Sequence, residues 1–265
     1  SIPFLSTLIK KNIKKGLGLS QARNIFTGAA PTPIALIKWF SRIGINIQEA
    51  YAMTENTCYS HVSYNNNINI GSVGQALPFC EVKLSEKNEI LIKHDALMNG
   101  YYKDKEETDK TIINGWLYTG DEGKIDAEGF LKITGRVKDI FKSSKGKYIA
   151  PSPIEMRFLA NKDIEQVCVV GNGMPQPIAI IVLSEKGVSK DLDKLNYSLE
   201  NTLDIINPKL DSHEKIHNVI VVKEQWTVEN KLLTPTMKIK RNLIEEKYKQ
   251  YYEFWYEKQR IYFCD

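Results

Sequence analysis

The sequence lacks the long apolar run, the paired cysteines and the strong charge excess that each mark a common class of protein. None of its apolar runs approaches the ~20 residues that a membrane-spanning helix needs, so we expect no membrane span. The four cysteines are scattered, with no CxxC pair and no His/Cys cluster at metal-ligand spacing. They predict reduced, structural thiols in a cytoplasmic protein. The net charge of +4 is small for 265 residues and does not by itself indicate nucleic acid.

What is present suits a soluble globular chain. Hydrophobic residues make up 42% and charged residues 26%, which is enough apolar material for one large or two moderate cores. The N-terminal stretch SIPFLSTLIKKNIKKGLG places apolar residues before basic ones, the reverse of a signal peptide. The sequence does not begin with methionine, which is typical of a fragment.

The first 55 residues have the pattern helix, strand, helix, strand. PFLSTLIKKNIKK has helical spacing and ends at Gly16, and TPIALIKWFSRIG begins with a capping threonine and a first-turn proline and ends at Gly44. The strands RNIFTG and INIQEAY flank the second helix, which predicts a parallel βαβ unit. GAAP (28–31) and YAMTEN (51–56) follow these strands, at the edge where open α/β sheets bind ligands.

After about residue 65 the sequence changes to short alternating runs separated by turns. CEVKLSEKNEILIKH predicts a hairpin, GWLYTGDEGKIDAEGFLKITGR predicts two strands with DAEG as their turn, and DKEETDKTI predicts a short helix capped by Asp104. Beyond residue 138 come a basic loop, a helix from near Pro153, the strands EQVCVVG, PIAIIVLS and NVIVV, a helix over roughly 189–206 and an aromatic C-terminal helix.

We therefore expect a mixed α/β and α+β fold with two domains. Residues 1–137 would be the end of a large domain, made of the βαβ unit and a small β subdomain. Residues 138–265 would form a complete, small and mobile α+β domain.

Six motifs follow one another along the chain. They are GAAP, YAMTEN, GSVGQALP, GWLYTGD, GRVKDIFKSSKGKYIAPSPIE and LTPTMKIKR. In this order and spacing they resemble the adenylate-forming enzymes, and most closely the long-chain fatty acyl-CoA synthetase branch. The likeness covers nearly the whole chain but only the carboxyl-terminal part of such an enzyme, because residues 1–27 contain no Ser/Thr/Gly-rich phosphate loop. Without the loop whose N–H groups cradle the triphosphate, we expect these 265 residues alone to be inactive.

The resemblance implies an ATP-dependent, AMP-forming ligase. A fatty acid, expected to be long-chain, attacks the α-phosphorus of ATP, and CoA then takes the acyl group from acyl-AMP. Because two anions meet in the first step, cations are needed. Lys238 matches the family's catalytic lysine, although its local sequence alone would equally suit a surface lysine. Lys240 and Arg241 are interpreted as ordinary surface charges.

The resemblance also implies a site for ATP/AMP and Mg²⁺. Glu55 matches a magnesium-binding glutamate and Thr54 a donor to the α-phosphate, while a Thr-Glu pair after a strand is also a helix-capping signal. Ala52 stands where the family has glycine, so its methyl could shift this turn. Asp121 matches the ribose-binding aspartate and Arg136 its charged neighbour on the ribose and phosphate side; the alternative is a pair of surface charges or a salt bridge.

Small residues and a tyrosine complete the nucleotide site that the resemblance implies. Tyr51 would pack against the adenine, and Gly28, Ala29 and Ala30 would lie along the edge of the base. Without the motif series these residues would suit a turn and a core tyrosine equally well.

The basic stretch at residues 135–155 is interpreted as a hinge followed by an anion-facing loop. Lys138 matches the hinge about which the small domain rotates between the two steps. Loop 142–148 would then form the passage for CoA, with Lys142 and Gly146 as its binding residues. KSSKGK is one residue longer than the common form of this loop, and a solvated charge cluster is the alternative.

Three further expectations concern partners. The C-terminal YKQYYEFWYEKQRIYF should pack on its own domain, with a peripheral membrane contact as the alternative. A homodimer through the large domain would suit the branch, and no nucleic acid is expected. Transfer to an acyl carrier protein instead of CoA, or nucleotide or CoA binding without catalysis, stay open as alternative functions.

Overall fold

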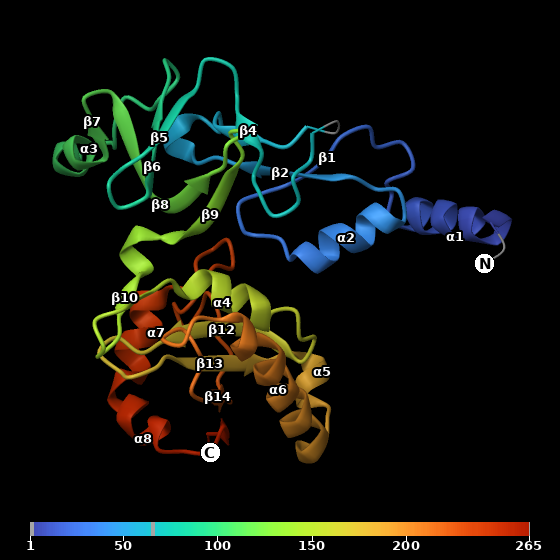
Figure 1. Cartoon of the computed structure of the whole chain (residues 1–265), viewed down its shortest axis with the longest axis vertical. Helices are drawn as coiled ribbons and strands as arrows, with labels where there is room; N and C mark the ends of the chain where they lie inside the picture. The colour runs from blue at the N-terminus through green and yellow to red at the C-terminus, as the bar shows by residue number, and fades with distance from the viewer. Residues whose placement is uncertain (1–2, 65–66, 265) are drawn as a thin grey trace. The chain divides into compact units, whose positions relative to one another are not determined.

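The computed structural model describes residues 3–64 and 67–264. It divides the chain into two compact units, Ser1–Thr134 and Gly135–Asp265 (Figure 1). Among the described residues no helix is long and apolar enough to cross a membrane. The four cysteines are free, and Cys168 is fully buried, as expected for structural thiols.

The first unit begins with the predicted helix, strand, helix, strand pattern. Helix α1 (Pro3–Gly16) precedes β1 (Ile25–Thr27), α2 (Ile34–Arg42) and β2 (Ile47–Tyr51). Strands β1 and β2 pair in parallel, so the predicted βαβ unit is confirmed. Strands β3 (His61–Val62) and β4 (Gln75–Ala76) extend this sheet with antiparallel pairing.

The predicted threonine cap of the second helix is wrong. Helix α2 begins at Ile34 after Pro33, and no side chain caps it. The hydroxyl of Thr32 instead lies 2.8 Å from the hydroxyl of Thr27 and ties the two ends of the GAAP loop together. Thr32 therefore stabilises the GAAP loop and does not cap the helix.

A second sheet of the first unit contains β5 (Glu81–Leu84), β6 (Glu89–Lys93), β8 (Trp116–Ile125) and β7 (Ile112–Ile113), with β9 (Leu131–Arg136) paired to β8. The β5–β6 hairpin and the β8–β9 turn are as predicted. Helix α3 (Lys105–Thr111) is capped as predicted, because Asp104 Oδ1 accepts from the Glu107 N–H at 3.0 Å. The core of this sheet contains Ile90, Ile92 and Leu131, and Tyr51 packs against it.

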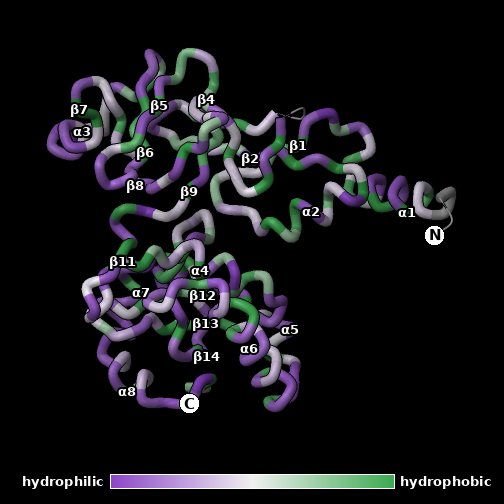
Figure 2. Tube along the Cα trace, in the orientation of Figure 1, coloured by the Kyte–Doolittle hydropathy of each residue, from purple (hydrophilic) through white to green (hydrophobic). Residues whose placement is uncertain are grey.

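The second unit is built on one mixed sheet with helices on both faces. Its strands run in the order β12 (Ile164–Val170), β13 (Ile178–Leu183), β14 (Val219–Val222) and β15 (Ile261–Phe263). Strands β12 and β13 are antiparallel, whereas β13, β14 and β15 are parallel. Alternate residues of β12, β13 and β14 enter two separate cores, so these strands are hydrophobic along almost their whole length (Figure 2).

The helices of the second unit divide between these two cores. Helices α4 (Pro151–Phe158) and α6 (Leu192–Ile206) cover one face, and α7 (Arg241–Tyr248) and α8 (Tyr252–Tyr256) cover the other (Figure 1). Short elements connect them: η2 (Val137–Asp139), β10 (Phe141–Lys142), β11 (Tyr148–Ile149), α5 (Glu185–Val188), η3 (Asn207–Lys209) and η4 (Lys249–Tyr251).

The predicted single aromatic helix at the C-terminus is wrong in form. The segment breaks into α7, η4 and α8, and the chain then returns as β15 to pair with β14. Tyr248, Tyr252 and Trp255 are buried against the sheet, whereas Tyr251 and Phe254 are about half exposed. The expectation that the segment packs on its own unit is therefore confirmed for most of its rings.

Candidate active site

The carboxyl ends of β1 and β2 bring two of the motifs together. Gly28 follows β1 directly, and a Cβ atom added to it would lie 3.0 Å from the backbone oxygen of Ala50 in β2. Ala29 has a left-handed φ of 64°, which its small side chain tolerates at modest cost. This edge therefore has room for backbone and small side chains only, in agreement with a flat ligand lying against it.

A backbone bulge places Asp121 beside Tyr51. At the bulge between β6 and β8, the Glu89 carboxylate accepts a hydrogen bond of 2.9 Å from the backbone N–H of Gly120. Gly120 has a φ of +72°, a conformation that glycine adopts without strain. The next residue, Asp121, accepts a hydrogen bond of 2.8 Å from the Tyr51 hydroxyl. Two predicted site residues 70 positions apart are thus in direct contact.

A buried histidine lies next to this pair. His61 is opposite Tyr51 in the β2–β3 ladder, and their ring centroids are 6.1 Å apart. Its Nδ1 lies 2.7 Å from the hydroxyl of Ser60, and only 3% of its surface is exposed. Burial lowers the pKa of His61 to about 4, so the ring is neutral at physiological pH.

The Thr54–Asn56 segment forms the single 3₁₀ turn η1 after β2. Thr54 is exposed, whereas Glu55 is half-buried, and its Oε1 accepts a hydrogen bond of 2.9 Å from the hydroxyl of Tyr101. Burial, followed by the neighbouring Glu55 carboxylate, raises the pKa of Tyr101, which keeps the phenol protonated as a donor. This contact of Tyr101 with Glu55 was not predicted from the sequence. The one sequence signal for Tyr101 was that it belongs to an aromatic pair after a hairpin. Ala52 does not adopt a left-handed φ, so its methyl fits this turn without backbone strain.

A single carboxylate suits Mg²⁺ bound together with a nucleotide. Mg²⁺ in such sites uses one or two carboxylates, with phosphates and water completing its octahedron. The described residues contain no group of three or more His, Cys, Asp or Glu that could hold a metal by themselves. Glu55, oriented by Tyr101, therefore fits a magnesium ion that arrives with phosphates and does not fit a preformed protein cage.

Lys238 lies at an exposed, tightly held turn between β14 and α7. The Thr234 N–H donates to the Lys238 carbonyl at 2.8 Å, and the Lys238 N–H donates to Thr234 Oγ1 at 3.0 Å. Met237 completes the turn with a left-handed φ of 63°. A bridge between Leu233 and Ile239 closes its base on the buried core. The lysine backbone is thus fixed while its side chain is exposed.

Loop 142–148 is a hairpin between β10 and β11. The Gly146 N–H donates to the Ser143 carbonyl at 2.9 Å, and the Ser143 N–H donates to the Lys147 carbonyl at 2.8 Å. Gly146 has a φ of +76°, which is the left-handed position of a three-residue hairpin loop. The turn itself therefore favours glycine here. The Lys142 ammonium lies 5.5 Å from the ring centroid of Tyr148.

The remaining predicted residues lie at the start of the second unit. Arg136 is the last residue of β9, and Lys138 lies within η2; both side chains are exposed.

The interpretation of Arg241 as a surface charge is wrong. Only 10% of its side chain is exposed, and its Nη2 donates to both carboxylate oxygens of Glu155 at 2.7 and 2.8 Å. It also donates to the Val169 carbonyl at 2.8 Å and to Cys168 Sγ at 3.2 Å. The local sequence could not reveal this, because every partner comes from a distant segment.

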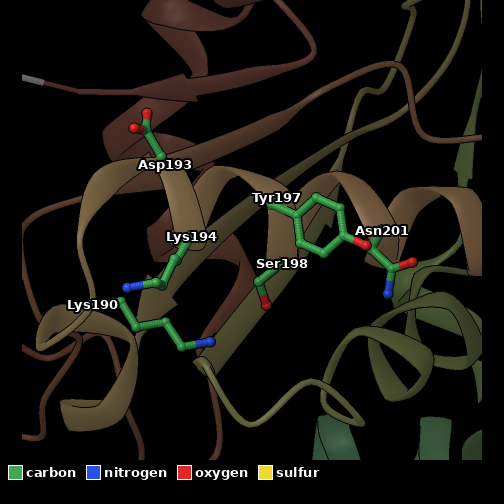
Figure 3. A pocket seen from close by; sticks show the side chains of 6 residues that line it. All are labelled: Lys190, Asp193, Lys194, Tyr197, Ser198 and Asn201. Carbon is green, nitrogen blue, oxygen red and sulfur yellow. The ribbon is translucent and has the colours of Figure 1, made fainter.

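A surface hollow of about 540 Å³ lies along α6, and none of its lining residues is a predicted site residue (Figure 3). Lys190 and Lys194 lie together at one end, and Tyr197, Ser198 and Asn201 follow along the helix. Both ammonium groups are already paired, Lys190 with buried Asp163 and Lys194 with Asp191. The hollow is therefore a poor match for an anionic substrate.

Comparison with known proteins agrees with this geometry. Residues 3–102 match the family described as AMP-binding enzyme, and residues 138–260 match the AMP-binding enzyme C-terminal domain. Long-chain-fatty-acid–CoA ligase FadD15 of Mycobacterium bovis is 29% identical over 269 residues, which cover 95% of this chain and 45% of that protein. Long-chain-fatty-acid–CoA ligase 6 of Rattus norvegicus is 31% identical over 280 residues, covering 94% and 40%. The chain spans less than half the length of these relatives.

Solved structures show the same fold. The anthranilate CoA ligase AuaEII in complex with anthranoyl-AMP superposes with a TM-score of 0.72 at 22% identity, over 86% of this chain and 45% of that one. O-succinylbenzoate coenzyme A synthetase of Bacillus subtilis in complex with AMP gives 0.68 at 24% identity, over 84% and 46%. The fold is therefore that of the adenylate-forming enzymes. The chain belongs to the AMP-binding enzymes and matches the carboxyl-terminal part of its long-chain ligase relatives.

The buried His61 predicts a specific pH dependence of stability. Its pKa is about 4 in the folded chain and about 6.5 when unfolded, so below pH 6.5 the unfolded chain binds a proton that the folded chain does not. The free energy of unfolding should fall between pH 6.5 and pH 4. We expect wild type to lose about 2 kcal/mol more than His61→Gln between pH 7 and pH 5, measured by urea unfolding.

The control is His213→Gln, at a partly exposed position of the second unit, which should keep the wild-type pH dependence. A His61→Gln protein with the same pH dependence as wild type would show that His61 does not carry the effect.

Proposed function

We propose that this chain is part of an ATP-dependent, AMP-forming ligase that activates a long-chain fatty acid and transfers the acyl group to CoA. One observation carries the proposal: the 2.8 Å hydrogen bond from Tyr51 to Asp121 joins two motifs 70 residues apart at the ligand-binding edge of a parallel strand pair. The long-chain substrate is supported by the names of the relatives, which include long-chain-fatty-acid–CoA ligases from bacteria and mammals.

The nucleotide occupies the first unit in this proposal. Asp121 accepts hydrogen bonds from the ribose hydroxyls, a role for which a carboxylate, with about four acceptor positions, is well suited. Tyr51 also packs against the adenine, beside Gly28, Ala29 and Ala30. The backbone approach at Gly28 supports this placement.

The phosphates lie at η1. Thr54 donates to the α-phosphate, and Arg136 adds positive charge on the ribose and phosphate side. Glu55, held by Tyr101, binds Mg²⁺, which when bound neutralises charge on the phosphate oxygens.

Lys238 supplies the mobile cation of the first step. Its ammonium binds the incoming carboxylate and a phosphate oxygen together, and this attraction grows as charge moves onto the bridging atoms. The rigid turn around Lys238 supports this role, because it fixes the lysine backbone and leaves the flexible stem to reach the substrates.

The second step uses a different face of the small domain. We propose the domain limits 1–137 and 138–265, with Lys138 as the hinge that withdraws Lys238 and presents the 142–148 hairpin. Lys142 then attracts the phosphates of CoA, and Gly146 gives its pantetheine arm a surface without side chains. The tight hairpin supports this, because hydrogen bonds fix its backbone while residues 144–148 are exposed.

Other features of the proposal concern partners and place. Two alternatives to CoA ligation are transfer of the acyl group to a carrier protein and ligand binding without catalysis. An assay that offers CoA and a carrier protein as acceptors distinguishes them. A cytoplasmic enzyme with a homodimer through the large domain is expected. A peripheral membrane contact would use the exposed rings of Tyr251 and Phe254.

Lys238→Ala should abolish acyl-adenylate formation. Loss of the one mobile cation should lower the ATP–pyrophosphate exchange rate of the full-length protein by about 10²–10³-fold. Exchange is measured with a series of fatty-acid chain lengths, beside the neighbouring variant Lys240→Ala, which should stay near wild type.

Exchange that persists in Lys238→Ala would remove this lysine from the chemistry. A wild-type protein that exchanges with none of the acids would overturn the ligase proposal as a whole.

The 265 residues expressed alone should form no acyl-adenylate. Residues 1–27 contain no Ser/Thr/Gly-rich phosphate loop, so the triphosphate has no cradle in this chain. Incubation with ATP, Mg²⁺ and a long-chain acid, followed by mass spectrometry for acyl-AMP, tests this. Robust turnover by the chain alone would contradict it.

Gly146→Ala should slow thioester formation specifically. Gly115→Ala is a closely matched control: its φ is +77° against +76°, and each added Cβ would meet only the Cε of a lysine, at 3.9 and 3.8 Å. Both should lose about 1 kcal/mol of stability from left-handed strain. Only Gly146→Ala should slow thioester formation from supplied acyl-AMP and CoA, by about tenfold. Equal rates in the two variants would exclude a specific role for this loop.

A further inference from the structure

The buried guanidinium of Arg241 joins four segments of the second unit. Its two terminal nitrogens hold Glu155 of α4 and the carbonyl of Val169 in β12, at 2.7–2.8 Å. Its Nε lies 3.5 Å from Oδ2 of Asp139 in η2. Arg241 is itself the first residue of α7, so its backbone starts the helix that follows the Lys238 turn.

The Lys238 turn is anchored immediately beside this arginine. The N–H of Lys240 donates to the carbonyl of Leu232 at 2.8 Å, which closes the base of the turn one residue before Arg241. Leu232 and Leu233 are buried, so the base of the turn is packed into the core of the unit. The position of the arginine therefore sets the position of the turn that carries Lys238.

Asp139 is not needed to neutralise the arginine. Both carboxylate oxygens of Glu155 already accept from Arg241 Nη2, and Glu155 Oε1 also accepts from the Val169 N–H at 2.7 Å. Asp139 adds a second carboxylate at longer range, with 28% of its side chain exposed. This contact is an ion pair without a hydrogen bond, and it places η2, whose middle residue is Lys138, beside the same guanidinium.

We propose that Arg241 and Asp139 are positioning residues, which fix the hinge segment and the Lys238 turn to one point of the small unit. This inference rests on the proposed function, in which Lys238 acts and the unit rotates about Lys138. With the link intact, a rotation at the hinge moves the turn by the same amount, and the ammonium reaches one defined place. With the link loosened, the same rotation delivers the lysine to a range of positions, so turnover falls while substrate binding does not.

The test uses Asp139→Asn in the full-length protein, because this variant leaves the buried Arg241–Glu155 pair intact. The matched control is Asp204→Asn, which removes another aspartate paired with an arginine, Arg260 at 2.6 Å, from the surface of the same unit. Asp139→Glu, which keeps the charge, serves as the rescue. The measurements are the thermal midpoint, the kcat and KM of ATP–pyrophosphate exchange, and thioester formation from supplied acyl-AMP and CoA.

We expect Asp139→Asn to have the same thermal midpoint as Asp204→Asn. Its exchange kcat should fall about tenfold, while the KM values for ATP and acid stay unchanged. Its rate of thioester formation should fall by less. Asp139→Glu should recover most of the rate. Exchange equal to that of Asp204→Asn would overturn the inference, as would a lowered midpoint with equal losses in both reactions. No exchange by wild type would instead overturn the proposed function, and this inference with it.

Discussion

The arrangement of helices and strands in the second unit depends on the buried charge of Arg241. Arg241 has five N–H donors in a rigid plane, and Glu155, Val169 and Asp139 lie around that plane. Removing a partner of such a group leaves a charge buried without compensation, which costs more than the pair contributes. Helix α4, strand β12, turn η2 and helix α7 must therefore keep their relative positions. The exposed Lys238 turn, closed by its own backbone hydrogen bonds, is joined to this arrangement through Arg241 at the start of α7.

In the first unit, backbone pairing positions the site residues. Parallel pairing of β1 and β2 brings Gly28 and Tyr51 to one edge, and the bulge at Gly120 turns Asp121 toward that edge. The polar residues there are oriented by protein partners: the Tyr51 hydroxyl donates to the Asp121 carboxylate, and the Tyr101 hydroxyl donates to the Glu55 carboxylate. Each unit thus combines a rigid support with a few polar groups placed at its surface.

Sequence reasoning succeeded where the determining interactions are local. Asp104 caps a helix whose first turn is the next few residues, and the β5–β6 hairpin closes over a short turn, so both were predictable. It failed where a residue distant in the sequence determines the local structure. Arg241 looked like one of several charges beside Lys238, but Glu155 lies 86 residues away in the chain. The aromatic C-terminal segment looked like one helix, whereas pairing of β15 with β14 requires the chain to turn back.

The sequence by itself determined the two-part organisation of secondary structure, because alternation, turns and caps act over a few residues. The order of its motifs, by resemblance, also indicated the family. It also named the groups that carry the proposed chemistry, among them Lys238, Glu55 and Asp121. The tertiary structure alone decided which groups meet: Tyr51 with Asp121, Glu55 with Tyr101, and Arg241 with Glu155. The physical reason is that a hydrogen bond or ion pair acts only across a few ångströms, and only the packed sheets bring such distant segments that close.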